Sequence, residues 1–295
     1  MKEPLQVPLY EEFTIPVVFH VVVSEEEVLT YGNLSAARIA ETMERLNNIF
    51  SGKATRNAAG VNTGIQFVLA QYNPAGELMD EPGINRVTVE EVTEGTPPDK
   101  YHRFLSQNNA IWPHEKYLNI WLMSETKYPK FWNSITKLCV PKYRLGSETL
   151  PGLSLPPVPS TWVPKVEQIG ILFRMSTFQY FQRSIDATAE RELVTCIGNY
   201  LGLLDTWKIN NSNVNDQCND TFAYGIVNNN GSLGTNSSWS KEVGSYRFLS
   251  ENIMDDPTGT HRSVSKDQAL RMYWVLKNCA GRSMWQSDFA LTGKE

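Results

Sequence analysis

The chain of 295 residues contains no run of about 18 apolar residues, so we predict no membrane-spanning helix. It also lacks any run of Lys or Arg longer than a pair, and its formal net charge is −5. A nucleic-acid surface would need a basic stripe, so we expect no nucleic-acid partner. Hydrophobic residues make up 41% of the chain and charged residues 20%, which is typical of a globular protein with one sizeable core.

The N-terminus lacks the apolar segment of a signal peptide, because Met1 is followed by Lys2, Glu3 and Pro4. Two interpretations are open from these residues alone. The protein is cytosolic, or it is exported and its signal segment has been removed.

Histidine and cysteine are scarce, with four of each. The histidines are His20, His102, His114 and His261, and the cysteines are Cys139, Cys196, Cys218 and Cys279. Cys196 falls in a predicted helix, which favours a buried thiol over a nucleophile, since no histidine is close to it in sequence. Four cysteines allow three fully paired arrangements, and a disulfide between Cys218 and Cys279 is a plausible staple in an oxidising compartment.

Hydrophobic periodicity predicts alternating strands and helices in the first two thirds of the chain. Strands are expected at 14–23, 64–72, 85–92, 117–124 and 168–173. Helices are expected from Ser35 to Phe50, at 99–107, at 187–201, and around 267–272, where Ser265 to Gln268 form a capping box. Residues 125–166 are rich in proline and 209–240 in Asn, Ser and Gly, so both read as irregular, the second as an unusually long loop. Of the eight tryptophans, Trp112, Trp132 and Trp162 fall in loop-like segments, where an exposed sugar-binding strip is the alternative to the favoured packing role.

One segment keeps the frame of a zinc-peptidase helix without its chemistry. In the frame HExxHxxGxxH, two histidines one turn apart hold zinc, a glutamate activates the bound water, and a glycine lets the chain bring back a third ligand. Here the three ligand positions hold Thr195, Asn199 and Asp205, the glutamate position holds Cys196, and the glycine is present as Gly202. Two neutral oxygens and one carboxylate are a poor zinc donor set, so we expect no zinc and no catalytic residue.

Several other stretches resemble the pappalysin-like, or cytophagalysin-type, metzincin peptidases in the expected order. They are 15–22 (IPVVFHVV), 46–50, 64–70, 117–122 (YLNIWL), 219–221, 250–256 and 267–272. In that family, Met254 would be the Met-turn methionine beneath the zinc site, and the tyrosine two residues later is Asp256 here. The resemblance covers most of residues 14–280, and its departures are concentrated at the five catalytic and ligand positions.

The resemblance implies an α+β metzincin-like fold, with a twisted mixed sheet and two long helices in an N-terminal lobe. It divides the chain into an extended lead-in (1–13), this lobe (14–205) and a smaller irregular lobe with the Met-turn and a last helix (206–295). It also favours an exported bacterial protein, in the periplasm or on the cell surface, with a lipid anchor on a removed N-terminus.

Three functions remain open at this point. The leading hypothesis is an inactive peptidase homologue that binds a peptide or protein in the former substrate cleft. The second is an enzyme with a rebuilt site, using Cys196 with a nearby histidine, or Asp205 and Asp256 as an acid–base pair. The third is a structural surface subunit. Calcium on Asp205, Asp220, Asp255 and Asp256 is a further alternative, although no EF-hand spacing occurs.

Overall fold

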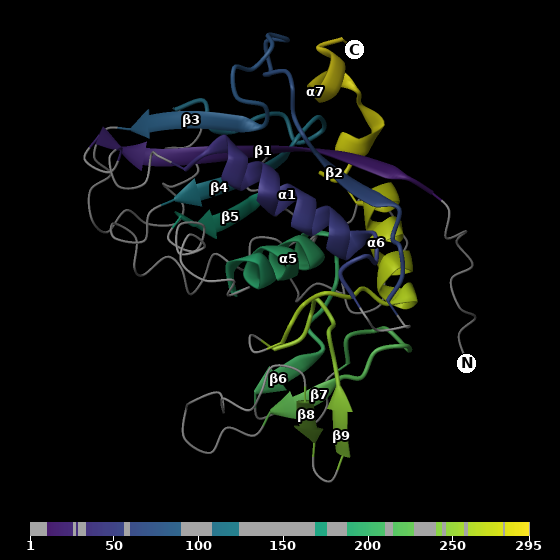
Figure 1. Cartoon of the computed structure of the whole chain (residues 1–295). Helices are drawn as coiled ribbons and strands as arrows, with labels where there is room; N and C mark the ends of the chain where they lie inside the picture. Colours follow the sequence, from purple (N-terminus) through teal and green to yellow (C-terminus); the bar gives the residue numbers. More distant parts are fainter. Residues whose placement is uncertain are drawn as a thin grey trace, which may run out of the picture.

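A five-stranded sheet organises the upper part of the molecule in the computed structural model (Figure 1). The structure describes residues 11–25, 28, 34–55, 60–89, 108–123, 169–175, 188–209, 215–226, 240–243, 246–256, 259–279 and 281–294. The strands are β1 (Phe13–Ser24), β2 (Ile65–Leu69), β3 (Ile84–Val89), β4 (Leu118–Met123) and β5 (Ile171–Arg174). The order is β2-β1-β4-β5, and β3 continues beyond β2 along the same edge of β1.

All described pairings in this sheet are parallel. The antiparallel member of the predicted mixed sheet does not occur among these five strands. β1 is the central strand, and nearly all of its twelve residues are buried. Burial on both faces explains why β1 is an almost continuous apolar run rather than an alternating one.

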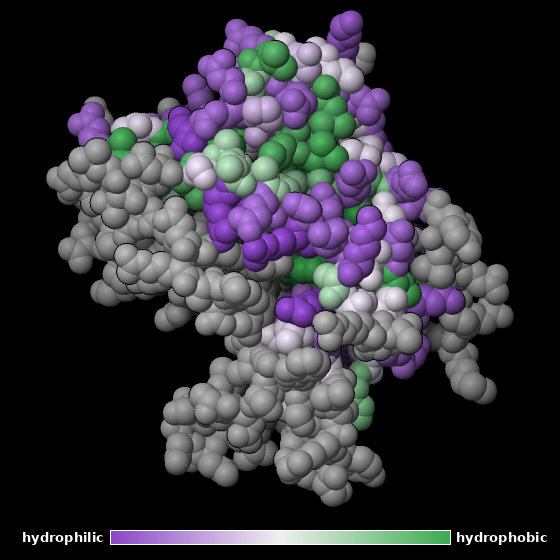
Figure 2. Space-filling view, viewed as in Figure 1, coloured by the Kyte–Doolittle hydropathy of each residue, from purple (hydrophilic) through white to green (hydrophobic). Residues whose placement is uncertain are grey.

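The two faces of the sheet are covered by different elements. Alternate β1 residues from Phe13 to Val23 pack with α1 (Ala36–Phe50) and α5 (Thr188–Tyr200) in the main core. The opposite face packs Val18 against Trp112, Tyr117 and Phe289, from the 110–117 segment and α7 (Phe289–Thr292). The exposed side of α1 carries Glu41 between Arg38 and Arg45, and Figure 2 shows hydrophilic residues in this part of the molecule beside an apolar area.

The lower part of the molecule follows α5 in the chain. It holds two small ribbons, the parallel pair β6 (Trp207–Ile209) and β7 (Tyr224–Ile226) and the antiparallel pair β8 (Ser240–Val243) and β9 (Tyr246–Leu249) (Figure 1). The chain then returns upward through α6 (Lys266–Asn278) and a 3-10 turn, Met284–Gln286. No helix in the described ranges has the length and apolar character needed to cross a membrane.

Most of the predicted elements are confirmed within a few residues. The strands near 14–23, 64–72, 85–92, 117–124 and 168–173 correspond to β1 to β5, and three of the predicted helices correspond to α1, α5 and α6. The prediction of a loop over all of 209–240 was wrong in part, because β7 lies inside it and pairs with β6. The helix at 99–107 and the segment 125–166, with Trp132 and Trp162, lie outside the described residues. The division of the chain at residues 13 and 205 stays a prediction.

Trp112 is only 7% exposed, so this residue packs in the core and does not contribute to a surface sugar-binding strip. Cys218 and Cys279 are separate buried thiols rather than a disulfide. Cys218 lies near the start of α6, since the next residue donates its backbone N–H to Asp267, whereas Cys279 ends that helix. A helix of this length spans about 20 Å, and a disulfide needs its Cα atoms within about 7 Å.

Ser265 is the N-cap of α6 and forms a capping box with Gln268. Removing its hydroxyl should therefore lower the stability of the protein. This hydroxyl accepts from the Gln268 backbone and donates to the Asp220 carboxylate at 2.6 Å. We expect Ser265→Ala to lower the free energy of unfolding by about 1–2 kcal/mol, because both bonds are lost. Ser35→Ala, at the simpler cap of α1, is the matched control and should cost about 0.5–1 kcal/mol in the same urea titration. Equal losses would contradict a contribution from Asp220.

Candidate functional site

The site helix α5 ends where the sequence places the glycine of the zinc frame. The helix stops at Tyr200, and Gly202 takes a φ of +91°, which favours glycine because it has no Cβ. The backbone N–H of Leu203 then bonds to the carbonyl of Gly198 at 2.9 Å. This termination turns the chain away from the helix axis and towards residues 205 and 206.

Two buried arginines hold this end of α5. Arg271 from α6 donates its Nε–H to the Gly202 carbonyl at 2.6 Å. Arg282 donates its Nε–H to the Tyr200 carbonyl at 2.8 Å, and its guanidinium carbon lies 3.5 Å from the centre of the Tyr200 ring. Cations near the C-terminal carbonyls complement the helix dipole, so both contacts stabilise the helix end.

Met254 lies directly against α5, in the 252–256 turn. The methionine is fully buried, and a Cβ added to Gly198 would meet its sulfur at 2.6 Å. Its backbone carbonyl accepts a hydrogen bond from the N–H of Thr206 at 3.1 Å, and the Thr206 hydroxyl also lies 3.1 Å from this carbonyl. Glycine at position 198 therefore lets the turn approach the helix closely, on the side opposite the sheet.

Thr195, at the first ligand position of the frame, bonds to the protein. Its hydroxyl donates to the Ile253 carbonyl at 2.8 Å and lies 3.0 Å from Nδ1 of His261. His261 is 3% exposed, and its Nε2 lies 2.9 Å from the Asp256 carbonyl oxygen. The Thr195 side chain thus ties α5 to the 252–256 turn through hydrogen bonds.

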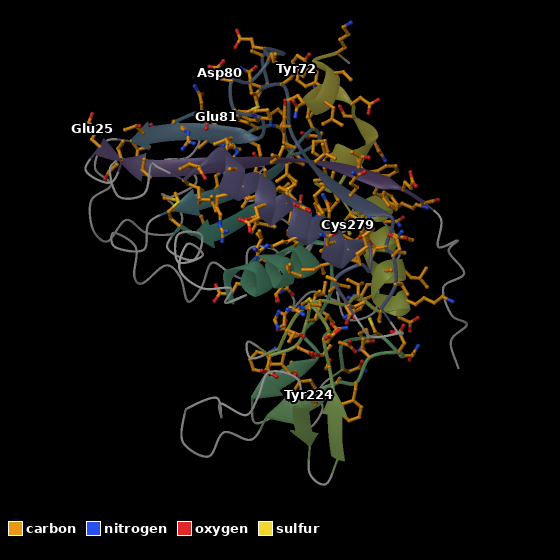
Figure 3. The ribbon with its side chains drawn as sticks, viewed as in Figure 1. Glu25, Tyr72, Asp80, Glu81, Tyr224 and Cys279 are labelled. Atoms are coloured by element: carbon orange, nitrogen blue, oxygen red, sulfur yellow. The ribbon has the colours of Figure 1, made fainter. Side chains whose placement is uncertain are left out.

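Asp255 and Asp256 are both buried and accept hydrogen bonds from neighbouring hydroxyls. Thr206 donates to Asp255 at 3.0 Å, and the phenol of Tyr224 donates to Asp256 at 2.7 Å. Tyr224 lies in the lower part of the molecule, below α5 (Figure 3). Burial, reinforced by the two carboxylates, raises the pKa of the Tyr224 phenol, so it remains a neutral donor. Asp256 is therefore the acceptor of a buried tyrosine, at the position where the resemblance expected a tyrosine itself.

The remaining predicted site residues have different surroundings. Cys196 is 7% exposed, belongs to the main apolar core and forms no disulfide. Asn199 is half-buried on α5, whereas Asp205 is exposed beyond the helix end. Asp220, one of the calcium candidates, accepts from Ser265 and from the Asp267 backbone at the start of α6.

The residues at the three ligand positions do not fit zinc. They supply a hydroxyl, an amide and a carboxylate, whereas protein zinc sites use mainly imidazole nitrogen and thiolate sulfur. The Thr195 hydroxyl is also already bonded to Ile253 and His261. Within the described ranges, no group of three or more His, Cys, Asp or Glu side chains is arranged to hold a metal ion.

Sequence reasoning missed three participants, His261, Tyr224 and Thr206. His261 is 66 residues from Thr195 along the chain, and Tyr224 lies inside the segment predicted as loop. Thr206 could have been found from the sequence, because it directly follows Asp205, the last position of the zinc-peptidase frame. No local pattern marked the other two, because only the tertiary fold brings them to the 252–256 turn.

The chain shares the fold of mirolysin, a metzincin-type metallopeptidase. Mature mirolysin of Tannerella forsythia, solved in complex with a cleaved peptide, is 21% identical, with a TM-score of 0.63 over 97% of this chain and 99% of that one. Mirolysin in complex with compound 9 gives 20% identity and a TM-score of 0.62 over the same shares. A promirolysin variant gives 19% identity and a TM-score of 0.62 over 95% of this chain and 86% of that one. No family model matches the chain, and no curated protein matches it in sequence.

Proposed function

We propose that this protein is an inactive homologue of a zinc metallopeptidase that binds a peptide or protein segment in the former substrate cleft without cleaving it. One observation carries the proposal. The frame and its surroundings are kept, from the turn at Gly202 to the packing of Met254 on Gly198, while none of the three ligand positions supplies a nitrogen or sulfur donor. A fold that keeps its frame after losing its metal ligands supports a use other than hydrolysis.

Peptide binding needs parts of the fold that do not depend on zinc. Clefts of this kind hold an extended chain by main-chain hydrogen bonds to a strand. β5 is the last strand in the described order and leads towards α5. Mirolysin, which shares the fold, has been solved with a cleaved peptide, and this supports a peptide as the ligand class here. The resemblance also supports export, which we propose as the setting of this activity.

The alternative of a rebuilt enzyme has less support. Cys196 lies in an apolar core at 7% exposure, which favours a structural thiol over a reactive thiolate. The other candidates, Asp205 and Asp256, differ in environment. Asp205 is exposed, whereas Asp256 is buried and bonded to Tyr224.

The test immobilises protein purified without chelator, incubates it with a tryptic digest of casein, and identifies retained peptides by mass spectrometry. We expect retained peptides to keep their tryptic ends, with or without added zinc. Asn199→Arg introduces a long charged side chain at a half-buried ligand position and should reduce retention at least fivefold. Glu44→Arg, which introduces the same side chain on the exposed side of α1, is the matched control and should retain peptides like the parent.

Two results would reject the proposal. New peptide ends that disappear when a chelator is added would show an active metallopeptidase. Equal retention by the parent and Asn199→Arg, or none by either, would show that peptides do not bind at α5 and would favour a structural subunit.

A further inference from the structure

His261 makes two hydrogen bonds that together determine its charge. It follows the 252–256 turn with a backbone φ of +51°, an uncommon conformation for a residue other than glycine. This conformation places the ring between the turn and α5. Nε2 faces the Asp256 carbonyl at 2.9 Å, and Nδ1 faces the Thr195 hydroxyl at 3.0 Å.

Counting protons shows that a neutral ring leaves one of these contacts without a proton of its own. A backbone carbonyl only accepts, so Nε2 must carry a proton to bond with Asp256. The Thr195 hydroxyl has one proton, and the Ile253 carbonyl, also acceptor-only, takes it at 2.8 Å. The bond between Thr195 and His261 then needs a proton on Nδ1. Each of the three contacts has a proton of its own only when both ring nitrogens are protonated.

The other described core histidine, His20, shows the opposite pattern. Its Nε2 lies 2.8 Å from Oδ1 of Asn119, an acceptor, and its Nδ1 lies 2.9 Å from Nδ2 of Asn85, a donor. One proton satisfies both bonds, so His20 is a neutral tautomer. The two rings are therefore expected to differ in charge within one protein, which makes His20 an internal reference.

The surroundings of His261 suit a positive charge. A Cβ added at Gly259 would lie within 3.0 Å of both the His261 ring and Cβ of Asp255, so the Asp255 side chain begins near the ring. Asp256 bonds the ring through its backbone and is itself buried. Tyr224 donates to Asp256 and remains neutral. Buried charges need partners of opposite sign, and the two buried aspartates beside the ring favour an imidazolium over a neutral ring.

We propose that His261 is held as a doubly protonated imidazolium that joins Thr195 of α5 to the 252–256 turn by hydrogen bonds. In a zinc peptidase of this frame, the first ligand position is tied to the site by the metal. Here a protonated side chain from the protein ties the same position to the neighbouring turn. His261 is a positioning residue in this proposal, which holds whether or not the cleft binds peptide.

The test measures ring protonation directly. Protein labelled with ¹⁵N-histidine is examined by long-range ¹H–¹⁵N correlation spectra at pH 7.5, and the His261 signals are assigned by their loss in His261→Gln. We expect both His261 nitrogens to show the shifts of protonated nitrogen, while His20 shows one protonated and one unprotonated nitrogen. A single protonated nitrogen on His261 at this pH would overturn the proposal.

A pair of variants at Thr195 tests the link itself. Thr195→Val removes the oxygen that accepts the Nδ1 proton, so His261 should become neutral at pH 7.5. Thr195→Ser keeps the hydroxyl and should keep the imidazolium. Signals unchanged by Thr195→Val would refute the link. Where this variant does not fold, the parent and Thr195→Ser spectra still decide, because both must show the doubly protonated ring.

The proposal also predicts the direction of a pH effect. At pH 7.5 a histidine in the unfolded chain is mostly neutral. A charged His261 then gives the folded protein about one proton more than the unfolded chain, so stability should fall as the pH rises through the titration of this ring. The urea midpoint of the parent should therefore decrease from pH 7.5 upwards, relative to that of His261→Gln. A constant difference between the two proteins over this range would contradict the expectation.

Discussion

Lowering the pH from about 7 to about 4.5 is expected to remove about 2–3 kcal/mol of stability through His20 alone. Burial lowers the pKa of His20 from 6.5 to about 4, only partly opposed by the hydrogen bond with Asn119. The unfolded chain therefore binds a proton in this range that the folded protein excludes. This contribution to stability is complete above pH 6.5 and is lost as the pH falls towards 4.

The structure explains why His20 excludes a second proton. The ring is fully buried on the central strand β1, with Trp112 edge-on at 5.4 Å and Trp121 stacked at 6.2 Å between ring centres. Asn85 donates to Nδ1, so a proton on that nitrogen would face another donor. Protonation thus requires breaking a buried contact as well as burying a charge.

Urea unfolding of the parent and of His20→Gln at both pH values isolates this residue. Glutamine offers a donor and an acceptor but does not titrate, so the variant should lose about 2–3 kcal/mol less than the parent on acidification, even though it is less stable at pH 7. Carboxylates whose pKa is lowered from its usual value, such as those of Glu41 and Glu81, affect both proteins equally. Parallel losses in the two proteins would show that His20 accepts a proton in the folded state.

Replacing Arg282 by methionine is expected to cost about 2–4 kcal/mol. The arginine is 4% exposed, and its guanidinium donates to the carbonyls of Tyr200 and Gly281 while stacking on the Tyr200 ring. Methionine fills a similar volume but removes the guanidinium donor to the Tyr200 carbonyl, at about 1–3 kcal/mol, and a cation–π contact of about 2 kcal/mol. The Gly281 carbonyl loses one donor and keeps the hydrogen bond from the Tyr200 hydroxyl. Relief from burying the charge offsets part of this loss.

The matched control is Arg45→Met on α1. Arg45 pairs with Glu41 at the surface, where such pairs contribute about 0–1 kcal/mol. Urea midpoints measured for both variants should differ clearly, and Arg282→Lys, which keeps the charge and one donor, should be intermediate. Hydrogen exchange adds a local measurement, since loss of Arg282 should increase exchange first at residues 199–203. Equal effects of Arg282→Met and Arg45→Met would contradict the role assigned to this cap.

Periodicity and end signals predicted β1 to β5 and the helices α1, α5 and α6, because those signals are local. Ile39, Met43, Leu46 and Phe50 recur at helical spacing, and all four face the core. The capping box at Ser265 and Gln268 correctly marked the start of α6. β7 escaped prediction because its three residues lie in a segment rich in Asn, Ser and Gly and are paired only through β6.

The sequence by itself determined the donor chemistry at positions 195, 199 and 205, because the identity of an atom does not depend on the fold. It also determined where α5 ends, since a turn with positive φ next to an apolar helix favours glycine. Only the tertiary structure decided what Thr195 contacts, and that Tyr224 and Asp256 meet. Those contacts join residues 32 to 66 positions apart, and no short-range pattern specifies such a pairing.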